Sequence, residues 1–240
     1  MKRKRWVAGV AIAVAALALL FFAGYTISRS RTFQFFGGIV NRVDTEAKVV
    51  ALTFDDGPTA RTDKVLAELD RAQVKATFFL VGQSIEEYPE ETKRIAEAGH
   101  QLANHSWSHQ RMVLKFPSFI SSEIEKTDAA IRDAGYQGDI QFRPPYGKKL
   151  LLLPWYLSRH SRKTILWDLE PNSIAEVDAS TENIVKYVVD NSQPGSIILL
   201  HVMYDGKGNS IAAIGGIAEG LKAKGYEFVT VNELLSYNER

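Results

Sequence analysis

The chain has 240 residues, of which 45% are hydrophobic and 24% charged, a composition typical of a globular protein with a sizeable core. It contains no cysteine, which excludes disulfide bonds, thiolate metal sites and a cysteine nucleophile. Four of the 29 basic residues lie between Lys2 and Arg5, and the other 25 are outnumbered by 28 acidic residues, so the charge does not indicate nucleic-acid binding.

The N-terminal segment predicts a helix that spans a membrane. Residues 7–27 are uncharged and would form a helix of about 31 Å, enough to cross the hydrocarbon core of a bilayer. Because the preceding basic cluster favours the cytoplasmic side, we expect a cytoplasmic tail over residues 1–6, a single-pass signal anchor over residues 7–27 and the remaining chain outside the cytoplasm. Arg29 and Arg31, beyond the apolar stretch, weaken this orientation signal slightly.

A cleaved signal peptide is the alternative for the same segment, and it would make the protein secreted. The apolar region of such a peptide usually has only about 7–15 residues and ends in an A-x-A-like site. The stretch here is longer and shows no evident site of that kind, which favours the anchor. Residues 28–46 are then expected to form a short stem before the following domain.

Strand-like and helical segments alternate through the rest of the chain. Within the stem, the run FFGGIV is a candidate for an additional strand. In chain order, apolar runs predict strands at residues 48–56, 75–82, 100–105, 139–145, 163–168, 195–201 and 227–231, and amphipathic patterns predict helices at residues 62–71, 86–98 and 118–134. Gly99, Gly135 and Gly225 stand where helix C-caps are expected.

This alternation predicts a parallel α/β fold in which helices cover the strands, either as an open doubly wound sheet or as a barrel. About seven strand–helix units and the lack of a Gly-rich dinucleotide loop favour the barrel. Polar residues stand at the C-terminal ends of predicted strands, namely Asp55, Asp56, His105, Arg143, Asp168 and His201. Because the active sites of parallel α/β barrels are built at this edge, we expect these residues to surround one site.

Two aspartates end the first of these strands, in the sequence ALTFDDGP. Holding Asp55 and Asp56 close together costs free energy unless a cation or hydrogen-bond donors compensate their charges. One interpretation is a turn or helix-cap carboxylate, which accounts for only one of the two. The other is a metal ligand beside a general base, because the Gly57-Pro58 turn interrupts the alternation of the strand and lets the two side chains take different roles.

The sequence HSWSH places two histidines four residues apart. On a helical turn, His105 and His109 would share a face, and both imidazoles could reach one metal ion. The spacing alone is more typical of surface residues, but with Asp56 it gives a His₂Asp ligand set that leaves a coordination position open, as catalytic sites do. These ligand types indicate one divalent ion, with zinc as the first choice and cobalt or nickel as substitutes.

Arg143, in the sequence RPPYG, and His201, at the end of SIILLH, are candidates for catalysis. A rigidly held guanidinium could orient an aspartate through two hydrogen bonds, and the alternative for Arg143 is an exposed salt bridge. His201 is either a core histidine or a proton donor to a leaving group.

Other aromatic residues and histidines carry weaker signals. Tyr146, Trp155 and Trp167 could line a sugar site, although aromatic residues in such segments are more often part of the core. His100 and His160 are interpreted as structural, because each lies at an element boundary and not at the strand-end edge.

Four motifs together resemble one family. TFDDGP, HSWSH, RPPYG and ILLH, in this order and at these separations, are similar to the motifs of the polysaccharide deacetylases, the NodB-homology family of carbohydrate esterases. The four motifs together are highly specific for this family, although no single one of them is. The resemblance covers about residues 39–238. It implies that residues 47–240 form a catalytic domain, a distorted (β/α) barrel that removes acetyl groups from N-acetylated sugars with a bound divalent metal ion. Such an enzyme is a hydrolase of carbon–nitrogen bonds other than peptide bonds.

The resemblance also implies roles for the metal site and the base. Asp55 would be the general base. Asp56 would bind the metal ion together with His105 and His109. Arg143 would position Asp55.

The remaining implied roles concern the substrate and the acid. The backbone N–H of Tyr146 would help to stabilise the oxyanion, Leu199 would wall the acetyl pocket, and His201 would be the general acid. One motif departs from the family pattern, which usually has an aspartate followed by tryptophan after the fifth strand, where the aspartate tunes the acid histidine. This chain has LWDLEPNS there, and Asp168 or Glu170 is the candidate for the missing carboxylate.

The expected function is therefore deacetylation of an extracytoplasmic glycan, with release of acetate. Peptidoglycan is favoured as the substrate because a domain tethered near the bilayer would meet it first, and the membrane is the other expected partner. A deacylase of a lipid-linked sugar is one alternative, suggested by the short stem. A weakly active or inactive glycan-binding module is another, suggested by the altered fifth-strand motif.

Overall fold

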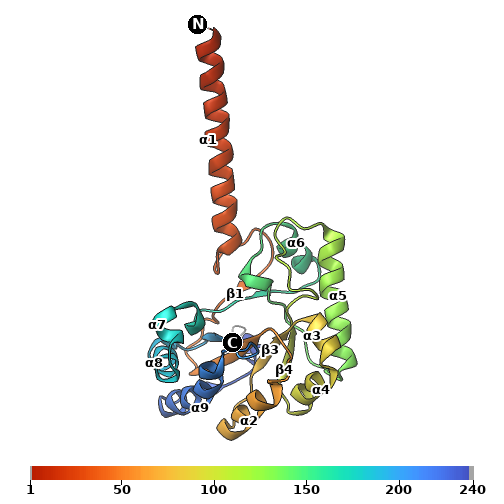
Figure 1. Cartoon of the computed structure of the whole chain (residues 1–240), viewed down its shortest axis with the longest axis vertical. Helices are drawn as coiled ribbons and strands as arrows, with labels where there is room; N and C mark the ends of the chain where they lie inside the picture. The colour runs from red at the N-terminus through yellow and green to blue at the C-terminus, as the bar shows by residue number, and fades with distance from the viewer. Residues whose placement is uncertain (1, 238–240) are drawn as a thin grey trace.

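The computed structural model describes residues 2–237, so Met1, in the predicted tail, and residues 238–240, at the end of the predicted catalytic domain, lie outside the described residues. The strands are β1 (Ile39–Val40), β2 (Val49–Asp55), β3 (Thr77–Leu80), β4 (Gln101–Asn104), β5 (Thr164–Ile165), β6 (Ile197–Leu200) and β7 (Glu227–Phe228). The α-helices are α1 (Lys2–Arg29), α2 (Thr62–Ala72), α3 (Gly82–Glu87), α4 (Pro89–Glu97), α5 (Pro117–Asp133), α6 (Leu152–Arg159), α7 (Ala175–Asp178), α8 (Thr181–Asn191), α9 (Gly208–Ala223) and α10 (Val231–Ser236), and two 3₁₀ turns are η1 (Pro145–Gly147) and η2 (Pro171–Ser173). In Figure 1, α1 stands away from a domain in which the other helices surround the strands.

The strands follow the path of an irregular barrel. Parallel ladders join β4, β3, β2 and β6 in that order, β7 pairs with the beginning of β2, and β1 pairs with β5. Single parallel bridges continue the path from Asn104 to Phe142, from Phe142 to Thr164, and from Leu169 to Ile198. The predicted parallel α/β fold is therefore confirmed, and the barrel is distorted because several of its steps are single bridges and not ladders.

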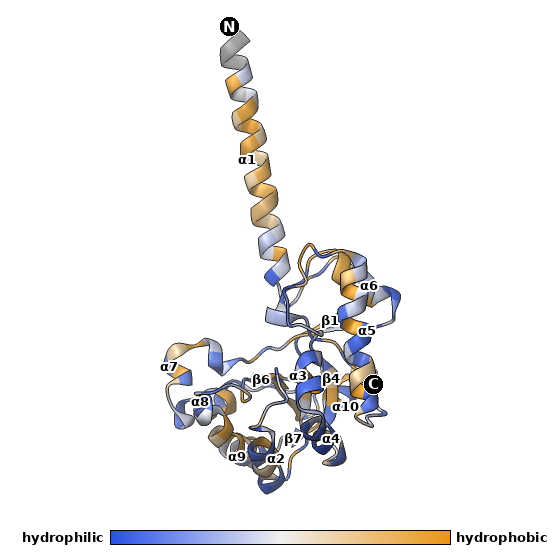
Figure 2. Ribbon diagram, turned by 45° about the vertical axis from the view of Figure 1, so that its right-hand side comes forward, coloured by the Kyte–Doolittle hydropathy of each residue, from blue (hydrophilic) through white to orange (hydrophobic). Residues whose placement is uncertain are grey.

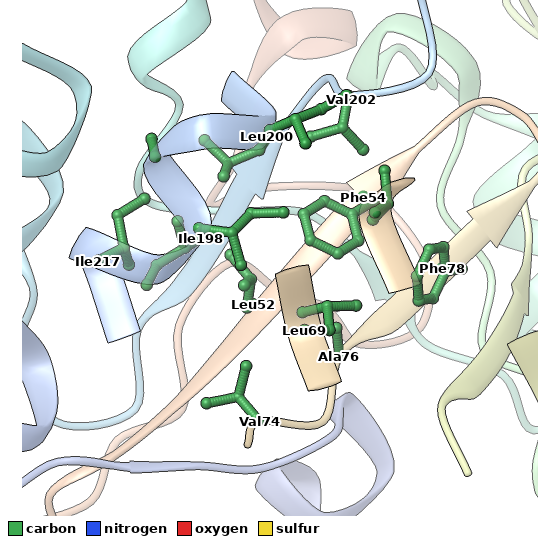
Figure 3. Packing of buried hydrophobic residues seen from close by; sticks show 14 of the residues in the cluster. Leu52, Phe54, Leu69, Val74, Ala76, Phe78, Ile198, Leu200, Val202 and Ile217 are labelled. Carbon is green, nitrogen blue, oxygen red and sulfur yellow. The ribbon is translucent and has the colours of Figure 1, made fainter. Parts of the chain in front are cut away.

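The central strand, β2, is buried on both faces. All of its residues are buried, as expected for a parallel strand covered by helices. On one face, Phe54 packs with Phe78 at a ring-centroid distance of 5.1 Å in the larger core cluster (Figure 3). On the other face, Ala51 packs in a second cluster with Phe79 and Leu199. A slip of one residue would exchange the two faces, so the core fixes where this strand ends.

Proline accounts for two differences from the sequence prediction. The predicted helix over residues 86–98 is two helices, α3 and α4, because Pro89 lacks a backbone N–H and begins the second of them. The predicted strand over residues 139–145 is reduced to the bridges at Phe142, because the Pro-Pro pair that follows cannot donate to a ladder.

Helix caps explain other boundaries. The strand predicted over residues 227–231 ends after two residues as β7, because Thr230 forms a capping box that begins α10. Gly99, Gly135 and Gly225 follow α4, α5 and α9 with φ of 76°, 91° and 83°, which confirms their predicted role in ending helices. The helices α6 to α10 lie outside the three ranges for which a helix was predicted from the sequence.

The predicted membrane span lies within α1. The part from Gly9 to Arg29 is long and apolar enough to cross a bilayer, and its apolar window is not buried against the domain (Figure 2). A signal sequence shares these properties with a membrane anchor. The division of residues 1–46 into tail, anchor and stem therefore stays a prediction.

The last residues of α1 and the segment that follows them pack on the domain. Ser28 is buried, and its carbonyl accepts a hydrogen bond from Lys149 N at 3.1 Å. Arg31 forms an ion pair with Glu170 at 2.9 Å, and β1 pairs with β5. The residues of the predicted stem are thus part of the surface of the domain and not an extended tether.

His100 and His160 have the structural environments that the sequence analysis assigned to them. His100 is buried, and its Nδ1 accepts a hydrogen bond from Ala76 N at 3.2 Å. His160 follows α6 and stacks on Tyr156 with ring centroids 4.1 Å apart. Burial and, secondarily, the charge of Lys75 lower the pKa of His100 to about 4, so its imidazole is neutral near pH 7.

The neutral His100 makes the fold sensitive to acid. Because its pKa is about 4 in the folded state against an ordinary 6.5, the unfolded state binds more protons between these values, and stability that is full above pH 6.5 is lost as the pH falls toward 4. The loss due to this one group is about 3 kcal/mol. Urea unfolding of the full chain in detergent across this range should show a steeper loss for the wild type than for His100→Gln. Equal slopes would contradict the assignment.

Candidate metal and catalytic site

The carboxyl ends of the parallel strands meet at one edge of the barrel. The register pairs Asp55, the last residue of β2, with Phe79 of β3, and pairs Leu80 with Asn104. His105 directly follows β4, and His201 directly follows β6. The strand ends thereby bring together side chains that lie far apart in the sequence.

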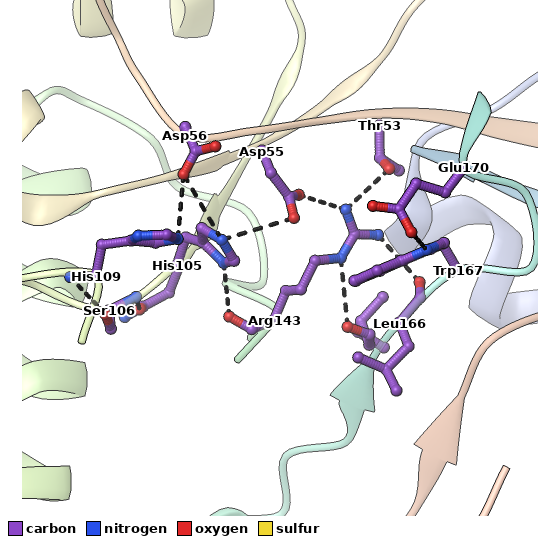
Figure 4. Close-up of polar contacts among 12 residues, drawn as sticks. Thr53, Asp55, Asp56, His105, Ser106, His109, Arg143, Leu166, Trp167 and Glu170 are labelled. Carbon is purple, nitrogen blue, oxygen red and sulfur yellow. Dashed lines mark hydrogen bonds and ion pairs between the residues drawn. The ribbon is translucent and has the colours of Figure 1, made fainter. Parts of the chain in front are cut away.

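Asp55 and Asp56 face different partners because the chain leaves the strand between them. Asp55 is the last extended residue of β2, whereas Asp56 has φ of 70°, in the left-handed region. Figure 4 shows Asp55 directed toward Arg143, and Asp56 directed toward the two histidines.

The HSWSH segment is a loop, and the helical turn expected from its spacing is wrong. Ser106 and His109 have φ of 68° and 53°, which no helix contains. Asn104 Oδ1 accepts a hydrogen bond from Ser106 N at 2.8 Å, and Ser106 Oγ accepts one from His109 N at 3.1 Å. These two turns, and not a helical pitch, bring the rings of His105 and His109 to a centroid distance of 5.0 Å.

Asp56, His105 and His109 form a set of potential metal ligands. One atom from each lies within 4.8 Å of the others, and Asp56 Oδ1 lies 3.2 Å from His109 Nε2. His105 Nδ1 lies 2.8 Å from the carbonyl oxygen of Arg143, a contact that orients Nε2 toward the carboxylates. Asp56 Oδ1 is buried and has no hydrogen-bond donor among the described residues. Since an unpaired buried carboxylate oxygen is costly, these residues fit a bound cation.

The lowered pKa of His109 also suits a metal ion. Burial chiefly, together with the neighbouring His105, lowers the pKa of His109, although Asp56 opposes the shift. Neutral imidazole is the form that binds a metal ion. Three protein ligands leave an open coordination position, which is the pattern of catalytic sites.

Arg143 holds Asp55 in a buried ion pair. The guanidinium is fully buried; its Nη1 donates to Asp55 Oδ1 at 2.5 Å and to Thr53 Oγ1 at 3.0 Å, and its Nη2 donates to the carbonyl of Leu166 at 3.0 Å (Figure 4). Burial alone would raise the pKa of Asp55, but the charge and hydrogen bond of Arg143, with smaller contributions from His105 and His201, outweigh it and hold the pKa below its usual value. Asp55 is therefore an ionised carboxylate adjacent to the metal-ligand set.

The two aspartates and the two histidines line one cavity of about 390 Å³, within the usual range for small-molecule sites, and Arg143 lies behind Asp55 without lining it. His201 enters it from the end of β6, and its backbone N–H donates to Asn172 Oδ1 at 2.8 Å. Tyr204 lines the same cavity. Burial and the neighbouring Asp56 carboxylate raise the pKa of Tyr204, so its hydroxyl stays protonated at neutral pH.

The residues considered for substrate contact differ in their position relative to this cavity. Tyr146 lines it, with φ of 60° and its ring 4.7 Å from that of His109. Trp167 also lines it. Leu199 is buried in the second core cluster, and Trp155 is exposed on α6; neither is among the lining residues.

The carboxylate of Asp168 is hydrogen-bonded to residues at the beginning of β6, and Asp168 does not line the cavity. Its carboxylate accepts hydrogen bonds from Ser196 Oγ at 2.7 Å and from Ile197 N at 2.8 Å. Burial raises its pKa, although these two hydrogen bonds oppose the shift. Asp168, one of the two candidates for the carboxylate beside His201, is therefore not in a position to fill that role.

Glu170, the other candidate carboxylate, lines the cavity together with His201. Its Oε2 accepts hydrogen bonds from Trp167 Nε1 at 2.8 Å and from Arg31 Nη2 at 2.9 Å. Arg31 also lies over the Trp167 ring at 4.8 Å. One wall of the cavity is thus a cluster that the segment after α1 completes.

Sequence reasoning missed several cavity residues. Arg29, Arg31 and Lys148 all line the cavity, but the two arginines were considered only as charges beyond an apolar stretch. The Arg31–Glu170 contact joins residues 139 positions apart, which no local pattern could indicate. Tyr204 lies three residues after His201, and its closeness to a strand end was the one available signal.

The comparisons with known proteins agree on the family. Residues 42–163 match the family described as polysaccharide deacetylase. A peptidoglycan-N-acetylglucosamine deacetylase from Bacillus cereus is 37% identical over 199 residues, which are 82% of this chain and 70% of that protein. The chain belongs to the polysaccharide deacetylase family. This confirms the resemblance that the four motifs predicted, and the relatives named as peptidoglycan deacetylases are hydrolases that act on N-acetyl amide bonds.

Two further matches extend the comparison. The peptidoglycan-N-acetylmuramic acid deacetylase PdaC from Bacillus subtilis is 34% identical over 194 residues, 80% of this chain but only 40% of PdaC. The solved structure of the Bc1960 peptidoglycan N-acetylglucosamine deacetylase superposes with a TM-score of 0.76 at 33% identity and covers 81% of this chain and 91% of that one. The deacetylase fold therefore extends over nearly all of the chain that follows α1.

Removing a ligand of this deacetylase-family site should abolish metal retention. Each of Asp56→Ala, His105→Ala and His109→Ala should weaken zinc binding by more than about 100-fold, because loss of a supporting residue alone costs about 10–100-fold. Elemental analysis of the purified full chain measures the effect. His160→Ala, on a histidine outside the cavity, is the matched control and should keep its metal; a metal-loaded His105→Ala protein would refute the ligand set.

Removing the guanidinium should shift the titration of the base. In Arg143→Met, burial acts on Asp55 without its counter-charge, so the pKa of Asp55 rises and the acidic limb of the pH profile of kcat/KM moves to higher pH. The unpaired buried carboxylate should also cost about 3–5 kcal/mol of stability. Arg143→Lys retains a charge and should show a smaller shift. An unchanged acidic limb in Arg143→Met would contradict the positioning role.

Proposed function

We propose that this chain is a metal-dependent N-deacetylase of a cell-envelope glycan built from N-acetylglucosamine-type sugars, with peptidoglycan as the glycan. One observation carries the proposal: adjacent aspartates have separate partners. Asp55 is paired with Arg143, while Asp56 stands with two histidines in a set suited to a metal ion. Relatives named as peptidoglycan deacetylases support the choice of substrate.

Zinc is the ion that we propose for the site, with cobalt or nickel as substitutes, because carboxylate and imidazole ligands suit these metals. Asp56, His105 and His109 would hold it. When bound, the ion supplies Lewis-acid activation of a water molecule and of the amide carbonyl.

The side chains of the cavity divide the proton transfers. Asp55 accepts the proton of the attacking water, a role that its ionised state and its fixed position against Arg143 support. His201, on the strand end across the cavity, donates a proton to the departing amine, which leaves acetate and a glucosamine unit. The backbone N–H of Tyr146 donates to the oxyanion, and a donor of this kind contributes about 3–4 kcal/mol to transition-state stabilisation.

The substrate-facing wall has a different composition from the one usual in the family. Glu170 takes the place of the aspartate near His201 and is itself held by Trp167. Trp167 gives the sugar an apolar surface at the same wall. Leu199, which was expected to wall the acetyl pocket, belongs to the same core cluster as Trp167 and would act on that pocket only through such packing.

The proposed location is the cell membrane, with α1 as a single-pass anchor, the N-terminus in the cytoplasm and the catalytic domain outside. The length and apolar character of the part from Gly9 to Arg29 support this, and the basic residues before it support the orientation. A cleaved segment would give a secreted enzyme instead.

A lipid-linked sugar is the second candidate substrate, and one observation favours it. Arg29 and Arg31, at the end of the proposed anchor, line the same cavity as the metal ligands. A sugar presented at the surface of the bilayer would therefore meet the reactive groups directly.

Acetate release tests the proposed function. The zinc-loaded full chain in detergent should release acetate from N-acetylglucosamine oligomers and from peptidoglycan, and a chelator should abolish it. Asp55→Asn should lower kcat by about 100- to 10,000-fold, the usual contribution of a general base, while retaining bound metal. Asp44→Asn, on an exposed aspartate, is the control and should stay active. Glycan binding without metal-dependent release would instead identify an inactive glycan-binding module.

A further inference from the structure

The end of α1 is joined to the loop that borders the active-site cavity. Lys149, in that loop, is fully buried; its backbone N–H donates to the carbonyl of Ser28, and its ammonium donates to the carbonyl of Ser30. Lys148, the preceding residue, lines the cavity and lies 5.4 Å from the ring of Tyr25 in α1. These contacts fix the last turn of the helix at the mouth of the site.

Three basic side chains from these two segments line the cavity: Arg29, Arg31 and Lys148. Arg31 is neutralised by its ion pair with Glu170. Arg29 donates a hydrogen bond of 2.7 Å to the hydroxyl of Tyr25 and lies 5.2 Å from the centre of its ring. Within residues 2–237, neither Arg29 nor Lys148 forms an ion pair, and both stand beside the same tyrosine.

The positive charges of Arg29 and Lys148 at the mouth of the cavity are not needed to neutralise the carboxylates deeper in it. Asp55 is already neutralised by Arg143, and Asp56 belongs to the metal-ligand set, so neither carboxylate needs Arg29 or Lys148. Two unpaired cations beside a polar cavity attract an anion, and guanidinium and ammonium groups bind phosphate and carboxylate well.

We propose that Arg29 and Lys148 form an anion subsite of the active site, which binds a phosphate or carboxylate group attached to the glycan that is deacetylated. This inference rests on the proposed function and specifies its substrate class. The subsite is built partly from the anchor itself, so it lies at the level where a membrane-spanning α1 leaves the bilayer. A lipid-linked sugar would present a phosphate there, and a muramic acid residue would present a carboxylate.

Sugar binding tests the subsite without requiring turnover. The probes are N-acetylglucosamine, its 1-phosphate and N-acetylmuramic acid, titrated by calorimetry into the zinc-loaded full chain in nanodiscs of phosphatidylcholine. The two anionic sugars separate the phosphate source from the carboxylate source. The double variant Arg29→Gln/Lys148→Gln removes the subsite, and Lys64→Gln/Arg159→Gln removes two exposed charges elsewhere as a matched control.

The expected result is tighter binding of at least one anionic sugar than of N-acetylglucosamine by about tenfold, lost in the subsite variant and kept in the control. Rising salt should weaken the preference in the wild type, because Arg29 is exposed and Lys148 half-buried, so that both charges are screened. Equal affinity for all three sugars in the wild type, or the same preference in the subsite variant, would overturn the proposal. Acetate assays on the same proteins separate this outcome from failure of the deacetylase function, which would abolish release from every substrate.

Discussion

The buried guanidinium of Arg143 is the interaction on which the site depends. It joins β2, through Thr53 and Asp55, to the segment after β5, through the carbonyl of Leu166, while the carbonyl of Arg143 itself orients His105. A buried charge is tolerated only with a well-placed partner, so these groups hold one another in a single arrangement. One residue thus positions both Asp55, the proposed base, and His105, a proposed metal ligand, and couples their geometry to the packing of the strands.

The site also concentrates left-handed backbone conformations of residues other than glycine. Of the seven non-glycine residues with positive φ in the described chain, four lie here: Asp56, Ser106, His109 and Tyr146. Such conformations cost free energy and persist only where surrounding contacts enforce them. Here they aim a carboxylate, an imidazole and a peptide group at one point, and Asp56 Oδ1 remains without a donor beside them. These conformations and the unpaired oxygen lower the stability of the fold at this edge, as expected for residues that serve the proposed function.

The sequence indicated the site better than it indicated how the site is built. Strand-end placement of Asp55, His105 and His201 follows from hydrophobic runs that end on polar residues, so it was predictable. The loop that brings His105 and His109 together depends on two left-handed residues, and helical spacing was the wrong explanation for it. The role of Asp168 was not predictable either, because its partners lie on β6, a strand some thirty residues further along the chain. The contacts of the segment after α1 could not be predicted either, because their partners, such as Glu170 for Arg31, also lie far along the chain.

Because residues 28–40 pack on the domain, no flexible linker separates α1 from the cavity. A flexible stem would let an anchored enzyme sample a volume set by the length of its linker. If α1 spans a bilayer as proposed, this chain has no such freedom, and its cavity would stay at a constant height above the lipid. Each molecule would then reach its substrate by lateral diffusion over a surface, and a substrate one domain's width farther out would be beyond its reach.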